Sequence, residues 1–388
     1  MTNSPKQTRR IFIVAGEESG DQLGGKLMRA LKAQSPVQIE FQGVGGQKMI
    51  AEGIKSLFPL EDIAVMGFGA VVARLRLILA RIKQTAEAVI ADNPDVLVII
   101  DSPDFTHRVA KRVRQKAPHI PIVDYVSPSV WAWRPGRAKK MRAYVDHVMA
   151  ILPFEPAAHK RLDGPPCSYV GHPLIERISE FRPKDNERKP IDHGRKQLIV
   201  LPGSRRSEVS RLMEPFGEAV ALLDAENPGG FDVIIPAVAH HAREIEERSK
   251  NWRVQPKLVF GEEAKLAAFR GAHAALAASG TVTLELALSK VPMVVGYKVS
   301  KFEEQLRFLV KVESIVLANL VLQNKTVPEF IQQDCTPEKL SAALRPLLSD
   351  TPERQQQLAQ FDRLDDLMGI GGEAPSERAA RIVLETAR

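Results

Sequence analysis

The chain has 388 residues, of which 44% are hydrophobic and 26% charged, so its composition predicts a soluble globular protein and its length predicts two domains. The net charge of +7 at pH 7 favours acidic partners, but the sequence contains no zinc knuckle, RNP-type aromatic strand or arginine-rich tail, which argues against nucleic acid. The chain has only two cysteines, far apart in the sequence, and lacks a secretory signal, which predicts a cytoplasmic protein. It also lacks any apolar run of about 18 residues, so we expect that it does not span a membrane.

An acidic loop follows the first predicted strand. Residues 11–15 form a short apolar run, and residues 16–21 (GEESGD) come directly after it. The glycines permit a sharp turn at the carboxyl end of the strand, where ligands bind in open α/β sheets. The loop lacks the dinucleotide-binding glycine pattern, and its carboxylates would repel a pyrophosphate. Glu17 is therefore a candidate to accept a proton and Ser19 to bind a sugar hydroxyl, although a helix cap explains Ser19 equally well.

An apolar segment next to a basic one occupies residues 63–90. Residues 63–73 are uncharged, and several arginines follow among leucines and isoleucines. Such a segment can lie in a membrane interface, with its apolar groups among acyl chains and its arginines at the head groups. Met66 and Phe68 are therefore candidates for lipid contact. A buried helix pair with a charged outer face explains the segment equally well.

Two carboxylates come after the next predicted strand, residues 95–100. Asp101 stands directly at the strand's carboxyl end, and Asp104 follows in a loop shaped by a proline. This position suits a general base. Because Asp104 can equally cap the following helix, Asp101 is the stronger candidate.

Two of the three tryptophans, Trp131 and Trp133, lie in one loop bounded by prolines. Aromatic rings in such a loop can line a sugar or acyl site, although structural packing is as common a role for tryptophan. Both are candidates to contact a sugar or an acyl chain. Beyond this loop, the charged, proline-containing stretch of residues 176–196 predicts a linker between two domains.

The second half opens with residues 198–208 (LIVLPGSRRSE), the pattern of a strand, a tight turn and a helix N-terminus. Unpaired backbone N–H groups and the helix dipole make such a turn suitable for an anion. Ser204, Arg205 and Arg206 are candidates to bind phosphate, because a guanidinium matches phosphate oxygens. An ordinary turn with two solvated arginines is the alternative.

A second turn of the same kind follows the predicted strand at residues 274–276. Ser279, Gly280 and Thr281 open a helix that carries Glu285 about one turn later. A phosphate would take the backbone N–H groups, leaving Glu285 to accept hydrogen bonds from a ribose diol. This motif is weak alone, but it is fairly specific when it shares a domain with the first turn.

The alternation of strands and helices predicts an α/β protein with two doubly wound, Rossmann-like domains that face a cleft, the two-domain glycosyltransferase architecture (GT-B). We expect an N-terminal domain over residues 1–175 for the acceptor and lipid. Residues 176–350 would form a C-terminal domain for the UDP-sugar. Helices in residues 351–388 would pack back toward the first domain.

A series of motifs, in order over nearly the whole chain, resembles the lipid-A-disaccharide synthase family. The motifs are AGEESGD (15–21), GVGG (43–46), IDSPDF (100–105), SPSVWAW (127–133), VGHP (170–173), LPGSR (201–205), SGT (279–281) and LE (284–285).

The resemblance implies that UDP-2,3-diacylglucosamine donates its sugar to the 6-hydroxyl of 2,3-diacylglucosamine 1-phosphate, giving the β-1,6-linked disaccharide 1-phosphate and UDP. It also implies an inverting enzyme without metal or cofactor, placed peripherally at the inner face of the cytoplasmic membrane in Gram-negative lipopolysaccharide synthesis. The basic excess supports contact with anionic lipid, and a homodimer is left open.

The residues fit that chemistry in named roles. Asp101 is our choice as the base, with Glu17 as a second catalytic candidate, and Arg205 would stabilise the leaving UDP. The resemblance places Asn319 near the cleft, and its amide is able to hold sugar hydroxyls. Arg206 stands where smaller residues are common in the family, which leaves open which arginine meets the diphosphate.

Two other functions are compatible with the sequence. One is a different UDP-sugar enzyme of the same architecture, a 2-epimerase or an undecaprenyl-linked N-acetylglucosaminyltransferase. The other is a non-catalytic nucleotide-binding partner at a membrane surface.

Overall fold

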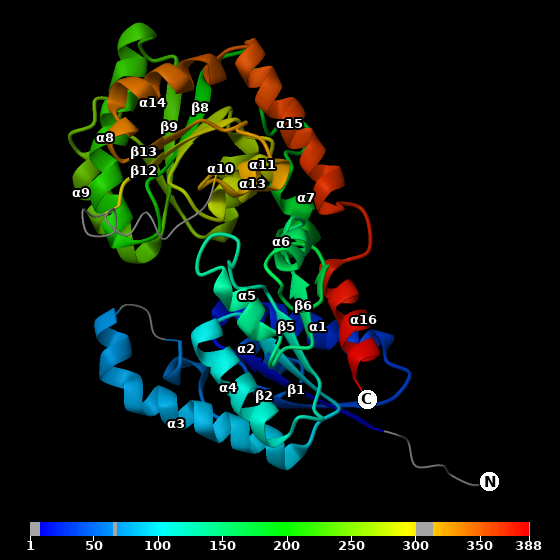
Figure 1. Cartoon of the computed structure of the whole chain (residues 1–388). Helices are drawn as coiled ribbons and strands as arrows, with labels where there is room; N and C mark the ends of the chain where they lie inside the picture. The colour runs from blue at the N-terminus through cyan, green and yellow to red at the C-terminus, as the bar shows by residue number, and fades with distance from the viewer. Residues whose placement is uncertain (1–7, 65–67, 300–312, 388) are drawn as a thin grey trace. The chain divides into compact units, whose positions relative to one another are not determined.

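The structure is a computed structural model that describes residues 8–64, 68–299 and 313–387, apart from the side chains of residues 68–73. Its contacts divide the chain into two compact units, Met1–Glu176 with Gly371–Arg388, and Arg177–Ile370 (Figure 1). The C-terminal helices are divided between the units. Helix α15 (Pro352–Met368) belongs to the second unit and α16 (Pro375–Thr386) to the first.

The first unit contains a parallel sheet in the order β3-β2-β1-β4-β5-β6-β7. Buried apolar residues dominate its central strands, as expected for a parallel sheet covered on both faces. The strands are β1 (Arg9–Ala15), β2 (Ile39–Val44), β3 (Lys55–Ser56), β4 (Val96–Ile100), β5 (Ile122–Tyr125), β6 (His147–Ala150) and β7 (Cys167–Tyr169).

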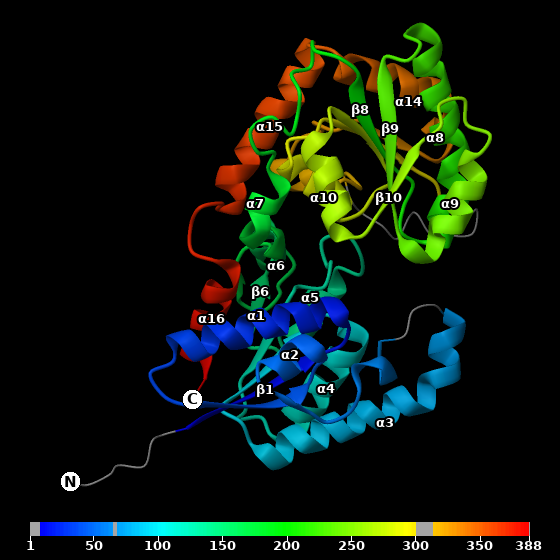
Figure 2. The same cartoon turned by 180° about the vertical axis from the view of Figure 1, so that it is seen from behind.

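Helices cover both faces of this sheet (Figure 2). Alternate residues of β1 point to opposite faces, so Phe12 packs with α3 (Phe68–Asp92) and α4 (Pro103–Lys116). Ile13 packs on the other face with α1 (Glu18–Gln34) and α16. The shorter helices are α2 (Gln47–Ala51), α5 (Gly136–Met141) and α6 (Glu155–Arg161). No helix in the described part of the chain is both long and apolar enough to cross a membrane.

The second unit contains a parallel sheet in the order β10-β9-β8-β11-β12-β13. Its strands are β8 (Lys196–Leu201), β9 (Phe231–Ala237), β10 (Lys257–Phe260), β11 (Ala274–Ala277), β12 (Met293–Tyr297) and β13 (Glu329–Ile331). One face packs against α8 (Arg206–Glu226) and α14 (Pro337–Leu344), and α10 (Glu262–Gly271) and α11 (Val282–Leu288) lie on the other. The remaining helices are α7 (Ile178–Phe181), α9 (Ala242–Ser249) and α13 (Leu317–Leu322).

Each sheet has one point where the strand order reverses. In the first unit β1 lies between β2 and β4, and in the second unit β8 lies between β9 and β11. Ligands bind open α/β sheets outside the carboxyl ends of the strands at such a point. The turns after β1 and β4, and those after β8 and β11, are the four turns that carry most of the predicted site residues.

Candidate functional site

The turn after β4 has an unusual backbone. Asp101 and Ser102 both have positive φ angles, 52° and 45°, and the Ser102 N–H donates to Asp101 Oδ1 at 2.7 Å. Two successive non-glycine residues in the left-handed region are costly, and such strain concentrates at functional sites. The conformation holds the Asp101 carboxylate at the tip of the strand.

The structure brings Glu17 beside Asp101. Glu17 is the N-cap residue of α1 and accepts a hydrogen bond from Ser19 Oγ at 2.6 Å. Burial raises the pKa of Asp101 to about 6; the hydrogen bond from the Ser102 N–H opposes this rise, and the charge of Glu17 and a hydrogen bond to it add to the rise. A carboxylate with a pKa in this range is a competent general base near neutral pH.

The other candidates of the first unit lie in more ordinary surroundings. Asp104 is exposed in the first turn of α4, and Arg137 Nη2 lies 3.4 Å from its Oδ1. The helix begins at Pro103, so Ser102 rather than Asp104 occupies the N-cap position. Met66 lies outside the described residues, as does the side chain of Phe68.

Both tryptophans have partners within the first unit. Trp131 Nε1 donates to Glu155 Oε1 at 3.1 Å, and its ring meets Phe154 edge-on at 5.1 Å between centroids. The Arg134 guanidinium lies 5.0 Å from the centre of the Trp133 ring. Burial raises the pKa of the Glu155 carboxyl to about 7. These contacts give Trp131 a packing role, and the half-buried rings leave part of each surface accessible.

A cavity of about 570 Å³ lies at the carboxyl edge of the second sheet. It collects six of the predicted residues from two turns that are far apart in the sequence. These residues are Ser204, Arg205, Ser279, Gly280, Thr281 and Glu285. The cavity therefore combines a guanidinium, a glycine-containing turn and a carboxylate at the point where the strand order reverses.

The side chain of Glu208, in the first turn of α8, closes the turn after β8. Glu208 Oε2 accepts hydrogen bonds from the backbone N–H groups of Ser204 and Arg205 at 3.0 and 3.2 Å. Glu208 Oε1 accepts from Arg205 Nη1 and from the Tyr297 hydroxyl, each at 3.2 Å. Gly203 has a φ of +112°, and a Cβ there would lie 2.4 Å from Glu208 Cβ. Glu208 already accepts from these two N–H groups, so the group that this turn offers to an anion is the guanidinium of Arg205, which lines the cavity and also pairs with Glu208 Oε1.

The turn after β11 is more open. Gly280 has a φ of +151°, and a Cβ placed there would meet no atom within 4 Å among the described residues. Ser279 Oγ donates to the Ile315 carbonyl at 2.6 Å, which fixes the start of the turn. A ligand can therefore approach the backbone of Gly280 and Thr281 closely.

The sequence analysis missed two charged residues of α10 that line the cavity. Lys265 and Glu262 come from α10, and Lys265 Nζ lies 3.0 Å from Glu285 Oε2 and 3.1 Å from Glu262 Oε2. The sequence analysis gave this stretch no role in the site. Helix α10 directly follows strand β10, so it begins at the same edge of the sheet as the other site residues. This position was the one signal that could have indicated a role in the site.

Two of the residues predicted to bind the UDP-sugar, Arg206 and Asn319, do not line this cavity. Arg206 points to α9, with Nε 3.5 Å from Glu244 Oε2. Asn319 is only 2% exposed, and its amide donates to Val327 O and Glu329 Oε1 and accepts from Val327 N. The structure therefore uses Asn319 to join α13 to the segment before β13, and does not bring it to the predicted sugar site.

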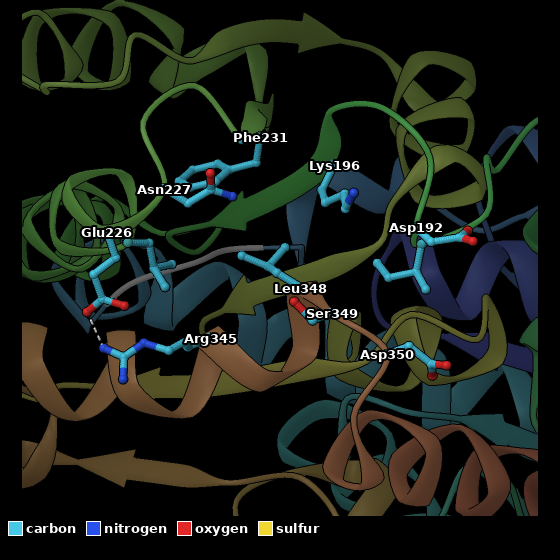
Figure 3. Close-up of a pocket in the computed structure, with 12 residues that line it drawn as sticks. Asp192, Lys196, Glu226, Asn227, Phe231, Arg345, Leu348, Ser349 and Asp350 are labelled. Carbon is cyan, nitrogen blue, oxygen red and sulfur yellow. Dashed lines mark hydrogen bonds and ion pairs between the residues drawn. The ribbon is translucent and has the colours of Figure 1, made fainter.

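A second cavity of about 380 Å³ lies at the opposite edge of the same sheet, near Lys196 and Phe231 at the amino ends of β8 and β9 (Figure 3). Glu226 and Arg345 form an ion pair on its wall. It contains none of the predicted site residues and lies at the edge where ligands of such sheets do not usually bind.

Solved structures share this architecture. The chain superimposes on the Staphylococcus aureus MnaA–UDP structure with a TM-score of 0.63, 13% identity and coverage of 97% of both chains. It matches Acinetobacter baumannii MurG with a TM-score of 0.57 and 13% identity, over 97% of this chain and 99% of that one. These likenesses concern the fold alone, and with the two parallel sheets they confirm the predicted GT-B type of α/β protein.

Sequence relatives identify the family. The family model described as lipid-A-disaccharide synthetase matches residues 11–383. The lipid-A-disaccharide synthase of Nitrobacter hamburgensis is 54% identical over 380 residues, which are 98% of this chain and 96% of that protein. The chain therefore belongs to the lipid-A-disaccharide synthase family of glycosyltransferases.

Proposed function

We propose that this protein transfers 2,3-diacylglucosamine from UDP-2,3-diacylglucosamine to the 6-hydroxyl of 2,3-diacylglucosamine 1-phosphate. The products are the β-1,6-linked disaccharide 1-phosphate and UDP. The observation that carries this proposal is the cavity at the β8–β11 reversal point, which gathers Arg205, Gly280 and Glu285 in one place. Such a set of groups suits a nucleoside diphosphate.

In this proposal the first unit supplies the base. Asp101 takes the proton of the acceptor 6-hydroxyl while that oxygen attacks C1 of the donor sugar from the side opposite UDP. The bond from C1 to the phosphate oxygen breaks, and the configuration at C1 inverts. The raised pKa of Asp101 and its pairing with Glu17 support this assignment, because a base must be able to gain a proton near the working pH.

The second unit holds the UDP part of the donor. Arg205 and the backbone N–H groups of the Gly280–Thr281 turn would stabilise the negative charge that develops on the leaving diphosphate. Glu285 would accept hydrogen bonds from the ribose hydroxyls. We propose that these cationic and backbone groups serve in place of a metal ion, since the sequence has no D-x-D motif.

Peripheral contact with anionic lipid, at the inner face of the cytoplasmic membrane, is part of the same proposal. Helix α3 exposes Leu75 and Leu79 beside Arg74 and Arg76, a combination suited to a lipid interface. The protein should sediment with anionic vesicles at low salt, and Leu75→Ser with Leu79→Ser should weaken this binding. Failure of the wild-type protein to sediment would refute the membrane proposal. Sedimentation equilibrium of the same preparations would decide whether a homodimer forms.

Release of UDP by the purified protein tests the reaction. Donor and acceptor lipids are supplied in detergent micelles with a chelator, and the product is identified by mass spectrometry. We expect UDP only when acceptor is present, together with the disaccharide. Turnover of unacylated UDP-N-acetylglucosamine without turnover of the acylated donor would replace the synthase proposal with an epimerase or another transferase.

A further inference from the structure

A three-residue ion cluster lies on the wall of the UDP cavity. Lys265 of α10 places Nζ 3.0 Å from Glu285 Oε2 and 3.1 Å from Glu262 Oε2. The side chains of Lys265 and Glu285 are 24% and 14% exposed, whereas Glu262 is 51% exposed. The inner pair, Lys265 with Glu285, is therefore the better-defined contact, because exposed partners are more strongly solvated.

The lysine is itself held in place. Its amino group lies 5.7 Å from the centre of the Phe269 ring, one turn further along α10. A lysine side chain is flexible, so contacts with two carboxylates and a ring restrict the rotamers it can adopt. A restricted amino group in turn restricts the orientation of the Glu285 carboxylate that it contacts.

The charge balance of the cavity gives a second reason to single out this pair. Among the described residues that line the cavity, Glu208, Glu262 and Glu285 are acidic, and Arg205 and Lys265 are basic. Glu208 is bound by backbone N–H groups, Arg205 and Tyr297. Glu285 lies on α11 and its partner Lys265 lies on α10. The position of the Glu285 carboxylate therefore depends on a second residue of the cavity.

From these contacts we infer that Lys265 is a positioning residue for recognition of the ribose. It binds Oε2 of Glu285 and so holds the carboxylate in the orientation that accepts hydrogen bonds from the ribose 2′- and 3′-hydroxyls. This inference rests on the proposed function, because it takes UDP as the ligand of this cavity. It assigns to Lys265 an action through Glu285 and no direct contact with the diphosphate.

The test compares UDP with 2′,3′-dideoxy-UDP, which keeps the uracil and the diphosphate and lacks both ribose hydroxyls. Dissociation constants are measured by calorimetry for the wild type, Lys265→Met and Lys265→Arg. In the wild type, loss of the hydroxyls should weaken binding roughly 30-fold, the size expected for hydrogen bonds to a carboxylate. In Lys265→Met this ratio should fall to about 3, since the loss should affect UDP far more than its dideoxy analogue. Lys265→Arg keeps the positive charge and should retain most of the ratio.

Three results would overturn the inference or its basis. Equal weakening of UDP and the dideoxy analogue by Lys265→Met would mean that Lys265 acts on the diphosphate. Unchanged affinity of Lys265→Met for UDP would mean that it has no role in binding. Equal affinity of the wild-type protein for the two ligands would instead refute the proposed role of Glu285, so the two failures are distinguishable.

One control variant and one further measurement on Lys265→Met test for indirect effects. Lys339→Met removes an exposed lysine that pairs with Asp334 outside the cavity, and it should leave both dissociation constants unchanged. In turnover assays, Lys265→Met should raise the KM for the donor roughly tenfold with kcat within about threefold of the wild type, the pattern of lost binding rather than lost chemistry. A fall in kcat with unchanged KM would contradict the positioning role.

Discussion

Gly16 lies so close to Ser102 that a Cβ on Gly16 would fall 2.2 Å from the Cβ of Ser102. The turns after β1 and β4 therefore touch at a position where only hydrogen fits. This contact joins the loop that carries Glu17 to the loop that carries Asp101, and it explains why the paired carboxylates depend on a glycine in the AGEESGD motif.

Gly16→Ala should destabilise the protein by about 2–3 kcal/mol, because the added methyl group must push the strained Asp101–Ser102 turn aside. The rate should fall as well, since Asp101 moves with the turn. Chemical denaturation and the turnover assay check both effects. Gly136→Ala is the matched control, because a Cβ there meets no described atom within 4 Å, and its stability should change by less than about 0.5 kcal/mol. Equal effects of the two substitutions would contradict the packing argument.

The pH dependence of the reaction should follow Asp101. A base acts only when it is deprotonated, so kcat/KM should fall as the pH is lowered through about 6, the raised pKa of this carboxyl. Glu17→Gln removes a negative charge that raises this pKa, so the acidic limb should move to lower pH. The measurement is a pH profile of kcat/KM for both proteins. A limb that stays in place would show that Glu17 does not influence the base, and a limb that moves to higher pH would show that Glu17 lowers the pKa of Asp101 instead of raising it.

Asp101→Asn should make the protein more stable while removing its activity. The pKa of this group is raised from 3.8 to about 6 in the folded protein, so folding favours the protonated form and the wild type loses stability as the pH rises through this interval. Asparagine removes that cost and tolerates the positive φ of the site. We expect a gain of about 1–3 kcal/mol above pH 6 and little difference below pH 4, measured by denaturation at both pH values. A variant that is less stable at neutral pH would contradict this account.

The two adjacent arginines should differ in their contribution to UDP binding. Arg205→Met removes the guanidinium that lines the cavity, and it should weaken UDP binding roughly 10- to 100-fold. Arg206→Met removes a side chain that is 84% exposed and faces Glu244, so its effect should stay below about threefold. Calorimetric titration with UDP checks both. A larger loss for Arg206→Met would reverse the assignment.

The fold could be predicted from the sequence where strands are apolar and buried over four or more residues. The apolar runs that form β1, β4, β8 and β11 are each followed by a turn rich in glycine or small polar residues. Both the strands and the ligand-binding edge of each sheet could therefore be predicted. The short strands β3, β7 and β13 could not be predicted, because two or three residues are too few to show a periodic pattern. Their pairing depends on neighbours in the sheet.

The candidate site was predictable to the extent that it lies in the turns themselves. Ser204, Arg205, Gly280 and Glu285 could be placed together because parallel strands end at one edge. Lys265 was missed, because it stands on a helix without a motif and its contact with Glu285 is purely tertiary.

The resemblance also suggested a sugar contact for Asn319, whose amide the structure uses between α13 and Val327. A buried amide with protein partners looks the same in sequence as one that binds a ligand. The roles of the residues that do line the cavity remain predictions.

We propose that Asp101 acts as the base and that the UDP cavity holds the donor without help from Asp101. One pair of measurements on Asp101→Ala tests this most directly. Turnover is measured with the acylated donor and acceptor, and UDP affinity is measured on the same preparation. The account predicts a loss of kcat of about 100- to 10,000-fold with a UDP dissociation constant within about twofold of the wild type. Retention of more than about a tenth of the wild-type rate would contradict the assignment of Asp101 as the base.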